Sequence, residues 1–145
     1  MISKWCIVLL FGCSTLVFGQ QWESNFDSAL DRAAKEAKPI LLVFSGSDWC
    51  APCRKLDRDI WQSETFIAYA SEHYILYKAD FPRKQKNKLL PDIAATNAKL
   101  AERFNPKGYF PLIVLMDEKG KVYAEMGYQR GSPQAYLDRL NSYLQ

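Results

Sequence analysis

Two cysteines separated by two residues constrain this chain more than any other feature of its sequence. They lie in the motif Trp49-Cys50-Ala51-Pro52-Cys53, which follows an apolar run at residues 39–44 and precedes a segment with helical character. Cysteines with this spacing at a strand-to-helix junction can close a small reversible disulfide, and the start of a helix favours the thiolate of the first cysteine. The motif therefore predicts thiol–disulfide exchange rather than a structural crosslink.

The composition fits one folded domain without a nucleic-acid or membrane-surface partner. The 145 residues suit a single domain, and contents of 48% hydrophobic and 14% aromatic residues suffice for a packed core. The formal net charge is +3, which falls to about +2 if Lys4 is removed with a leader. A charge this small gives no reason to expect binding to nucleic acid or to anionic lipid.

The N-terminal residues are typical of a secretory signal peptide. Lys4 supplies a positive start, residues 6–18 are apolar apart from a serine and a threonine, and a small glycine suited to cleavage follows. We therefore expect a signal peptide at residues 1–19, a mature domain at residues 20–145, and export to the periplasm. A membrane anchor is disfavoured because the apolar stretch is shorter than the roughly 20 residues that a spanning helix needs. Lipidation at Cys13, which would give an anchored lipoprotein, is the minor alternative.

Removal of this leader simplifies the cysteine count. Cys6 and Cys13 leave with it, so Cys50 and Cys53 are the only cysteines of the mature domain. A bridge between them closes a tiny loop and adds little entropic stabilisation, so reactivity explains the pair better than a disulfide scaffold does. Half of a zinc site is disfavoured because structural zinc takes four Cys or His ligands and His73 is the only histidine. We expect no metal, and no cofactor other than the Cys50–Cys53 disulfide.

Apolar periodicity and turn signals divide the rest of the chain into alternating helices and strands. Helices are predicted at residues 25–38, 52–62, 64–72, 93–104 and 133–144. Strands are predicted at residues 40–44, 74–79, 112–116 and 122–126, the last two joined as a hairpin. Residues 20–24 are expected to form a loose lead, and residues 83–88 a solvated basic loop. The alternation predicts the α/β class, with a central mixed β-sheet flanked by helices on both faces.

Three features at matching positions resemble the thioredoxin superfamily. They are the Trp-Cys-Ala-Pro-Cys motif after a buried strand, the pair Phe110-Pro111 at the head of a later strand, and Gly127 between the hairpin and the last helix. The resemblance spans nearly all of the expected mature chain and implies a thioredoxin fold. The string at residues 44–50 is similar to exported bacterial thioredoxin-like proteins more than to cytosolic thioredoxin.

The two cysteines take distinct roles on chemical grounds. Cys50 is the expected nucleophile because it lies at a helix N-terminus, where free backbone N–H groups favour an anion. Cys53, one helical turn further along, is the expected resolving thiol that attacks Cys50 and frees the product. Ala51 and Pro52 between them limit the backbone freedom of the pair and are expected to tune its redox behaviour. Trp49 is expected to offer substrates an apolar platform.

The resemblance implies further site residues around the pair. It places a cis peptide bond at Pro111, which sets the backbone of Phe110 beside the disulfide for pairing with an extended substrate segment. Together with Trp49, the apolar side chains of Tyr109 and Phe110 are the expected substrate-binding groups.

Two departures from thioredoxin are visible. Counting back from Cys50, Phe44 stands where thioredoxin has a buried carboxylate, so the usual proton acceptor for the second cysteine is missing. The segment at residues 81–98 is longer than its thioredoxin counterpart, which leaves room for a different partner surface. Lys78 lies at a strand end near the active site of the family. It either replaces part of the missing carboxylate's electrostatic influence or forms a plain surface pair with Asp80.

The sequence predicts an exported thiol–disulfide oxidoreductase that acts on protein disulfides. The Ala-Pro dipeptide is closer to the Gly-Pro of reducing thioredoxins than to the Pro-His of strong oxidants, which favours a reductase or isomerase supplied with electrons by a membrane relay. The expected partners are protein thiols and disulfides, and a monomer is the default for this fold. Two alternatives are a client-binding, chaperone-like module and a dedicated reductant for cytochrome c maturation.

Overall fold

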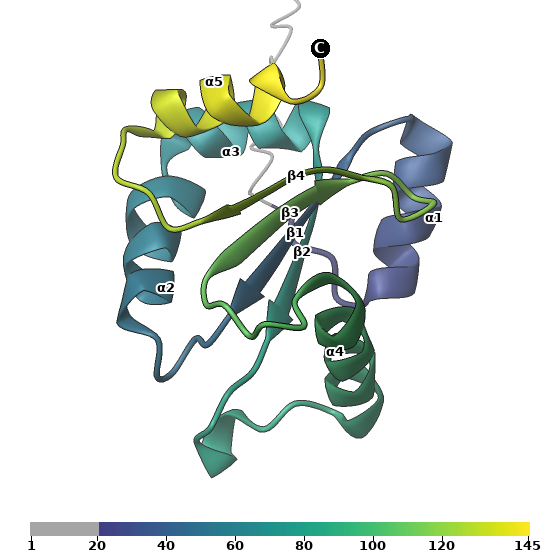
Figure 1. The fold of residues 1–145 in the computed structure, drawn as a ribbon, viewed down its shortest axis with the longest axis vertical. Helices are drawn as coiled ribbons and strands as arrows, with labels where there is room; N and C mark the ends of the chain where they lie inside the picture. Colours follow the sequence, from purple (N-terminus) through teal and green to yellow (C-terminus); the bar gives the residue numbers. More distant parts are fainter. Residues whose placement is uncertain (1–20) are drawn as a thin grey trace, which may run out of the picture.

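A mixed β-sheet runs through the part of the chain that the computed structural model describes, residues 21–145 (Figure 1). Its strands are β1 (Ile40–Ser45), β2 (Ile75–Asp80), β3 (Leu112–Met116) and β4 (Val122–Gly127). Within the described residues they are ordered β2-β1-β3-β4. β1 is parallel to β2 and antiparallel to β3, and β3 and β4 form an antiparallel hairpin. The expected signal peptide, with Cys6 and Cys13, lies outside the described residues.

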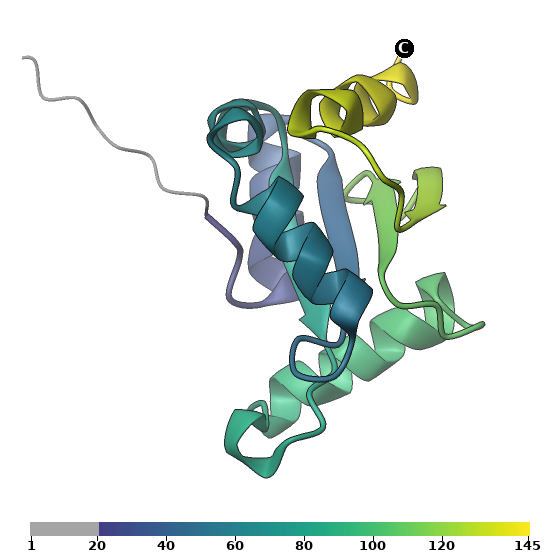
Figure 2. The same ribbon diagram turned by 90° about the vertical axis from the view of Figure 1, so that its left-hand side faces the viewer.

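Helices cover both faces of this sheet, as Figures 1 and 2 show. They are α1 (Phe26–Glu36), α2 (Ala51–Leu56) with its π-helical continuation η1 (Asp57–Trp61), α3 (Glu64–His73), the short 3₁₀ turn η2 (Gln85–Asn87), α4 (Pro91–Phe104) and α5 (Pro133–Ser142). Helices α1 and α4 pack on one face, and α2, α3 and α5 pack on the other. The predicted α/β class, with a central mixed sheet between helices, is confirmed. The helix predicted at residues 52–62 is α-helical only in α2 and becomes π-helical in η1.

β1 lies inside the sheet and is buried over its whole length. Its side chains alternate between two cores, because successive residues of a strand point to opposite faces. Leu41 and Val43 pack in the core beneath α2, α3 and α5, which also contains Trp61. Leu42 and Phe44 pack in the core beneath α1 and α4. Burial on both faces explains why the sequence has an uninterrupted apolar run here.

Side-chain caps fix where three of the helices begin. Asn25, Ser63 and Ser132 each accept a hydrogen bond from the backbone N–H three residues later, which satisfies a donor that the first helical turn leaves free. α1 ends at a left-handed Ala37 (φ 52°), two residues before Pro39. Among residues 21–145, no helix combines the length and the apolar character that crossing a membrane requires.

Residues 21–24, expected to form a loose lead, are tied to the sheet instead. Trp22 forms an isolated parallel bridge with Leu76 of β2, and the Glu23 N–H donates to the Leu76 carbonyl at 2.8 Å. The Trp22 ring meets that of Trp61 edge-on at 6.4 Å and packs against the core. The expectation was wrong because the Trp22 ring and the Glu23 backbone find partners in the core and in β2 that the local sequence does not signal.

Candidate active site

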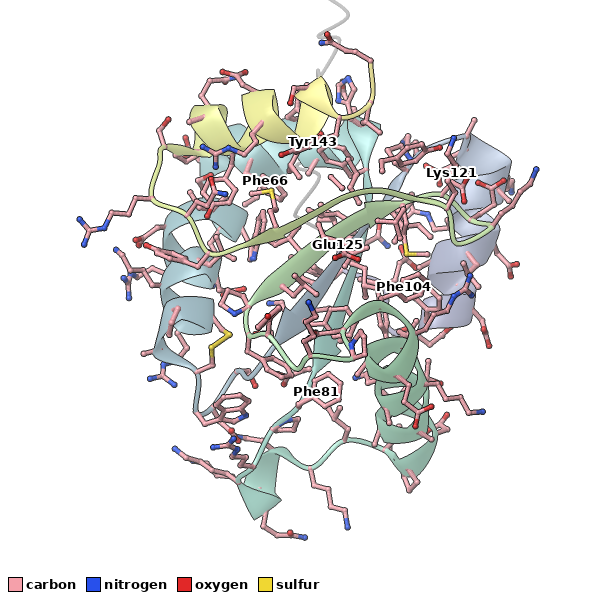
Figure 3. All side chains as sticks on the ribbon, in the orientation of Figure 1. Phe66, Phe81, Phe104, Lys121, Glu125 and Tyr143 are labelled. Carbon is pink, nitrogen blue, oxygen red and sulfur yellow. A yellow bond between two sulfur atoms is a disulfide. The ribbon has the colours of Figure 1, made fainter. Side chains whose placement is uncertain are left out.

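The cysteine pair lies where the chain leaves β1 and enters α2. Cys50 and Cys53 form a disulfide with a Cα–Cα distance of 5.2 Å, and Figure 3 shows it as the yellow bond at the start of this helix. Cys50 occupies the N-cap position with an extended backbone, and its sulfur accepts a hydrogen bond from the Cys53 N–H at 3.3 Å. Both residues are buried, with exposed fractions of 5% and 3%. Cys50 keeps the larger of the two exposed fractions.

The local sequence explains why a helix begins at this point and what charge it favours. Ala51 is the best helix former, and Pro52 sits in the first turn, where the N–H that it lacks needs no partner. The first turn contains no acidic side chain that would oppose negative charge on Cys50. Arg54 and Lys55 add positive charge to the same helix. The arrangement therefore favours a thiolate at Cys50.

A tight loop at residues 46–49 holds an indole beside the cysteines. The N–H groups of Trp49 and Cys50 both donate to the Gly46 carbonyl, at 3.2 and 2.8 Å. The Trp49 ring lies so close over Gly46 that a Cβ atom there would be 2.3 Å from Cε2 of the ring. The indole N–H donates to the Phe81 carbonyl at 2.7 Å, which fixes the orientation of the ring. The loop thus requires a glycine at position 46.

Aromatic rings from separate segments meet around this indole. Phe110 packs edge-on against Trp49 and Phe81, with ring centroids 5.3 and 5.5 Å apart. Phe81, which Figure 3 shows at the lower end of the sheet, stacks on Phe44 at 6.4 Å. The Arg83 guanidinium lies 3.8 Å from the centroid of a Trp49 ring. We call Trp49, Phe81 and Phe110 the aromatic wall. It lies against the loop that precedes Cys50, and the exposed Arg83 guanidinium packs on it.

The expected substrate-binding residues of the loop before β3 are held by one buried side chain. The Phe110–Pro111 peptide bond is cis, and the Tyr109 side chain is 57% exposed. The amide of Asn105, which is 4% exposed, accepts a hydrogen bond from the Tyr109 N–H at 2.9 Å and donates to the Tyr109 carbonyl at 2.8 Å. Sequence reasoning missed Asn105, for which the Asn-Pro turn signal after α4 was the only indication.

Cys53 faces a different environment from Cys50. It lines a cleft of about 410 Å³ together with Asp57 and Lys78. The Lys78 ammonium forms an ion pair of 2.6 Å with the Asp57 carboxylate, and both side chains are about 30% exposed. The alternative of a Lys78–Asp80 surface pair is wrong, because the Asp80 carboxylate accepts hydrogen bonds from the N–H and hydroxyl of Ser47, at 2.9 and 2.5 Å.

Asp57 places a carboxylate in the cleft beside Cys53, from a different part of the fold than thioredoxin's buried acid. Phe44, at the position where thioredoxin has its buried acid, is fully buried in the core beneath α1 and α4. Asp57 is four residues after Cys53, and helical residues at that spacing lie on the same face. The carboxylate that shares a cleft with Cys53 therefore comes from the start of η1 rather than from β1, and sequence reasoning did not identify it.

Asp48 ties the active-site loop to the segment after β2. Its carboxylate accepts hydrogen bonds of 2.9 Å from the Arg83 N–H, the Lys84 N–H and the Asn87 side-chain amide. These bonds, that from the Arg83 N–H first, lower the pKa of Asp48 to about 2. Sequence reasoning missed this residue because its partners lie some 35 positions further along the chain.

The buried polar side chains of Tyr77 and Asn97 connect α4 to the end of β2, which in turn bonds to the loop before Cys50. Asn97 on α4 is 1% exposed; its Oδ1 accepts from the Tyr77 hydroxyl at 2.7 Å and its Nδ2 donates to the Asp80 carbonyl at 3.1 Å. Asp80 in turn binds Ser47, so α4, β2 and the cysteine loop are linked.

His73 lies away from this network. It is an exposed residue at the end of α3, and its ring stacks on a neighbouring tyrosine.

The fold and the site together define a class of protein. A mixed sheet between helices, a cysteine pair at the start of α2 and a cis-proline before β3 are the features of a thioredoxin-type redox protein. A family model described as thioredoxin-like matches residues 21–118, and the chain belongs to this thioredoxin-like family. In residues 21–145 no three His, Cys, Asp or Glu side chains are grouped to hold a metal ion.

Individual relatives narrow the class further. The disulfide bond reductase DsbH of Chlamydia pneumoniae is 38% identical over 124 residues, which cover 86% of this chain and 72% of that protein. A solved structure of a DsbH oxidoreductase has a TM-score of 0.80 and 36% identity, covering 87% of this chain and 85% of that chain. The thioredoxin-related protein DsbJ of Chlamydia pneumoniae is 25% identical over 113 residues, 77% of this chain and 32% of that protein.

These similarities bear on the predictions made from sequence. They confirm the thioredoxin fold, and they confirm that the chain is a thiol–disulfide oxidoreductase. The redox group of such an enzyme is its cysteine pair, here Cys50 and Cys53.

Proposed function

We propose that this protein reduces disulfide bonds in other proteins, with electrons supplied by a membrane relay. The observation that carries the proposal is the Cys50–Cys53 disulfide at the start of α2, where the Cys53 N–H donates to the Cys50 sulfur. A thiolate at Cys50 is stabilised there, which suits it to attack. The Ala51-Pro52 dipeptide and the similarity to a disulfide bond reductase support the reducing direction.

The reaction proceeds in two exchanges. The Cys50 thiolate attacks one sulfur of a substrate disulfide, forming a mixed disulfide while the second substrate sulfur leaves as a thiolate. Cys53 then loses its proton and attacks the Cys50 sulfur. This restores the Cys50–Cys53 disulfide and releases the first substrate sulfur as a thiolate. Two electrons have passed to the substrate, and a dithiol donor must return two electrons to the protein.

Asp57 accepts the Cys53 proton in the second exchange. It lines the cleft that Cys53 also lines, and the ion pair with Lys78 fixes its carboxylate there. General-base assistance of this kind contributes rate only at the step that breaks the S–H bond. Asp57 therefore acts on the release of the mixed disulfide and not on its formation.

Substitution of Asp57 separates these two steps. We expect Asp57→Asn to slow the release of the mixed disulfide by at least about 10-fold at neutral pH, with the first attack unchanged. Asp59→Asn is the matched control, because Asp59 is an exposed carboxylate that pairs with Lys55 and Arg58. Stopped-flow tryptophan fluorescence with a disulfide peptide resolves both steps. Equal slowing in the two variants would contradict the assignment.

The substrate segment lies along the aromatic wall. Trp49 and Phe110 present apolar surface beside the cysteine pair, and the exposed Tyr109 extends it. The family resemblance assigns Pro111 the task of presenting the Phe110 backbone to an extended substrate chain. The Asn105 amide keeps this loop in place through its two hydrogen bonds to Tyr109.

Export to the periplasm is part of the proposal. The charged start and apolar stretch of residues 1–19 support a cleaved signal peptide, which leaves a mature monomeric domain from residue 20. Mass spectrometry of the protein from cells tests this directly. A mature N-terminus at Gln20 is expected, whereas a lipid-modified N-terminus at Cys13 would refute the free periplasmic form.

Cysteine variants test the proposed reaction. Cys53→Ser is expected to accumulate a mixed disulfide with substrate, because the first exchange proceeds and the second is blocked. Cys50→Ser is expected to lose all turnover and to trap no substrate. Non-reducing electrophoresis reads both results. If Cys50→Ser retains the full effect of the wild type on an unfolded client, the protein acts as a client-binding module and the proposal fails.

A further inference from the structure

The segment between β2 and α4 extends past the end of the sheet beside the active site. It comprises residues 81–90, contains η2, and forms the lowest part of the molecule in Figures 1 and 2. The three hydrogen bonds to the Asp48 carboxylate fix it to the loop that leads to Cys50. The segment is thereby held in one position relative to the cysteine pair.

Four basic side chains on this segment have no acidic partner. Arg83, Lys84, Lys86 and Lys88 are exposed, and none of them forms an ion pair with a carboxylate of residues 21–145. The oxygens of Asp48 accept from backbone N–H groups and an amide. The segment therefore presents four cations against the single carboxylate of Asp48 that it binds, and its local charge is positive.

A groove of about 490 Å³ lies between this segment and the start of α4. Apolar side chains line part of it, namely Phe81, Pro82, Leu89, Pro91 and Ala94. Basic side chains line another part, namely Arg83, Lys84 and Lys88. Asp80, whose carboxylate accepts hydrogen bonds from Ser47, also lines it, so the lining combines three cations with one anion and is positive on balance. We call this site the basic groove.

We infer that the basic groove binds an acidic, extended segment of the substrate protein, next to the disulfide that Cys50 attacks. The inference rests on the proposed function and names the class of substrate. Phe81 and Arg83 belong to the groove and also contact Trp49, so a chain that lies on the aromatic wall continues into the groove. Its carboxylates meet unpaired cations there, and its apolar side chains meet the apolar lining.

A protein segment fits the basic groove better than a nucleic acid does. Of its lining residues only Phe81 is aromatic, whereas single-stranded nucleic acids are held by several stacked rings along a basic channel. An acidic peptide needs only the cations and the apolar surface that the groove provides. Substrates with Asp or Glu close to the reactive cysteine are therefore preferred.

Peptide binding tests the groove without requiring turnover. Two fluorescent peptides are compared, identical except that one carries four Glu and the other four Gln beside a serine that replaces the reactive cysteine. The wild type is expected to bind the Glu peptide roughly 3- to 10-fold more tightly, because exposed ion pairs contribute modestly. Salt at about 0.5 M is expected to remove most of the difference.

Substitution of lysines shows whether the preference for the Glu peptide comes from the basic groove. The double variant Lys84→Gln/Lys88→Gln is expected to bind both peptides almost equally. The matched control is Lys35→Gln/Lys119→Gln, which removes two exposed, unpaired lysines from α1 and from the β3–β4 turn. It is expected to keep the wild-type ratio. Equal affinity of the wild type for both peptides, or the same loss in both double variants, overturns the inference. Competition by oligothymidylate as strong as that by the Glu peptide also overturns it.

Reduction of a small neutral disulfide tests the reductase function separately from substrate binding in the basic groove. Hydroxyethyl disulfide carries no charge and has no acidic segment for the basic groove, so its reduction by the wild type and by Lys35→Gln/Lys119→Gln tests the reductase chemistry alone. Failure of the wild type to reduce it would refute the reductase function, while the peptide-binding ratio would still decide whether the groove selects acidic segments.

Discussion

A methyl group at Gly46 is expected to dismantle the aromatic wall. The Cβ of Gly46→Ala would lie 2.3, 2.5 and 2.7 Å from three atoms of the Trp49 indole, closer than real Cβ contacts occur. The indole is itself held by its hydrogen bond to the Phe81 carbonyl and by the edge-on contact with Phe110. The ring must therefore leave its place, since the alternative is a shift of the loop backbone that carries Cys50.

The cost follows from the contacts that the ring loses. The hydrogen bond to Phe81 contributes about 0.5–1.5 kcal/mol, and the aromatic pair with Phe110 about the same. The exposed contact with the Arg83 guanidinium adds about 0.5–1 kcal/mol. Gly46→Ala is therefore expected to lower the free energy of unfolding by about 1.5–4 kcal/mol. Reduction of a protein disulfide should fall more than reduction of hydroxyethyl disulfide, because the substrate platform is lost.

Urea unfolding followed by circular dichroism measures this cost, and the chain supplies a matched control. A Cβ at Gly131 would meet the Ala135 methyl at 3.5 Å and the Tyr136 ring at 3.9 Å, which are ordinary van der Waals distances. Gly131→Ala is therefore expected to be nearly neutral. If Gly46→Ala were no less stable than Gly131→Ala, the fixed position of the indole would be refuted.

Two further predictions concern buried polar groups. Asn97→Leu leaves the Tyr77 hydroxyl and a backbone carbonyl without partners, and is expected to cost about 2–5 kcal/mol of unfolding free energy. Adding Tyr77→Phe should recover part of that cost, and strict additivity of the two changes in urea unfolding would disprove the coupling. Burial raises the pKa of Tyr74 above its usual value, so the folded state favours the neutral phenol. Its stabilising effect is full below the unfolded pKa of about 10 and is lost as the pH rises beyond it. Tyr74→Phe is therefore expected to flatten the loss of stability as the pH rises above about 10, and an unchanged slope would count against it.

The sequence was sufficient for those parts of the fold that local patterns determine. The buried strand β1, the β3–β4 hairpin and the helix starts at Ser63 and Pro133 follow from apolar runs, turn residues and helix-start preferences over a few neighbouring positions. The cysteine motif predicted thiol–disulfide exchange because two cysteines with this spacing, at a strand-to-helix junction and without further ligands, have few other roles. These features therefore did not depend on how distant segments meet.

Apart from Asn105, whose partner Tyr109 is four positions away, the residues that sequence reasoning missed act across long separations. The Asp48 carboxylate binds backbone some 35 positions away, and the Asp57 carboxylate meets Lys78 from 21 positions away. Nothing in the local pattern distinguishes either aspartate from a solvated one. Trp22 was misjudged for the same reason, because its partner Trp61 is brought to it only by the tertiary fold.

The reduction potential of the Cys50–Cys53 pair tests the central claim, that this oxidoreductase works as a reductase. Equilibration with glutathione buffers, followed by tryptophan fluorescence, gives the value directly. Because a tenfold change in the equilibrium corresponds to about 30 mV, the measurement separates the two directions clearly. The account predicts a potential near that of thioredoxin, about −270 mV, whereas a value near −120 mV would mark a disulfide donor and contradict it.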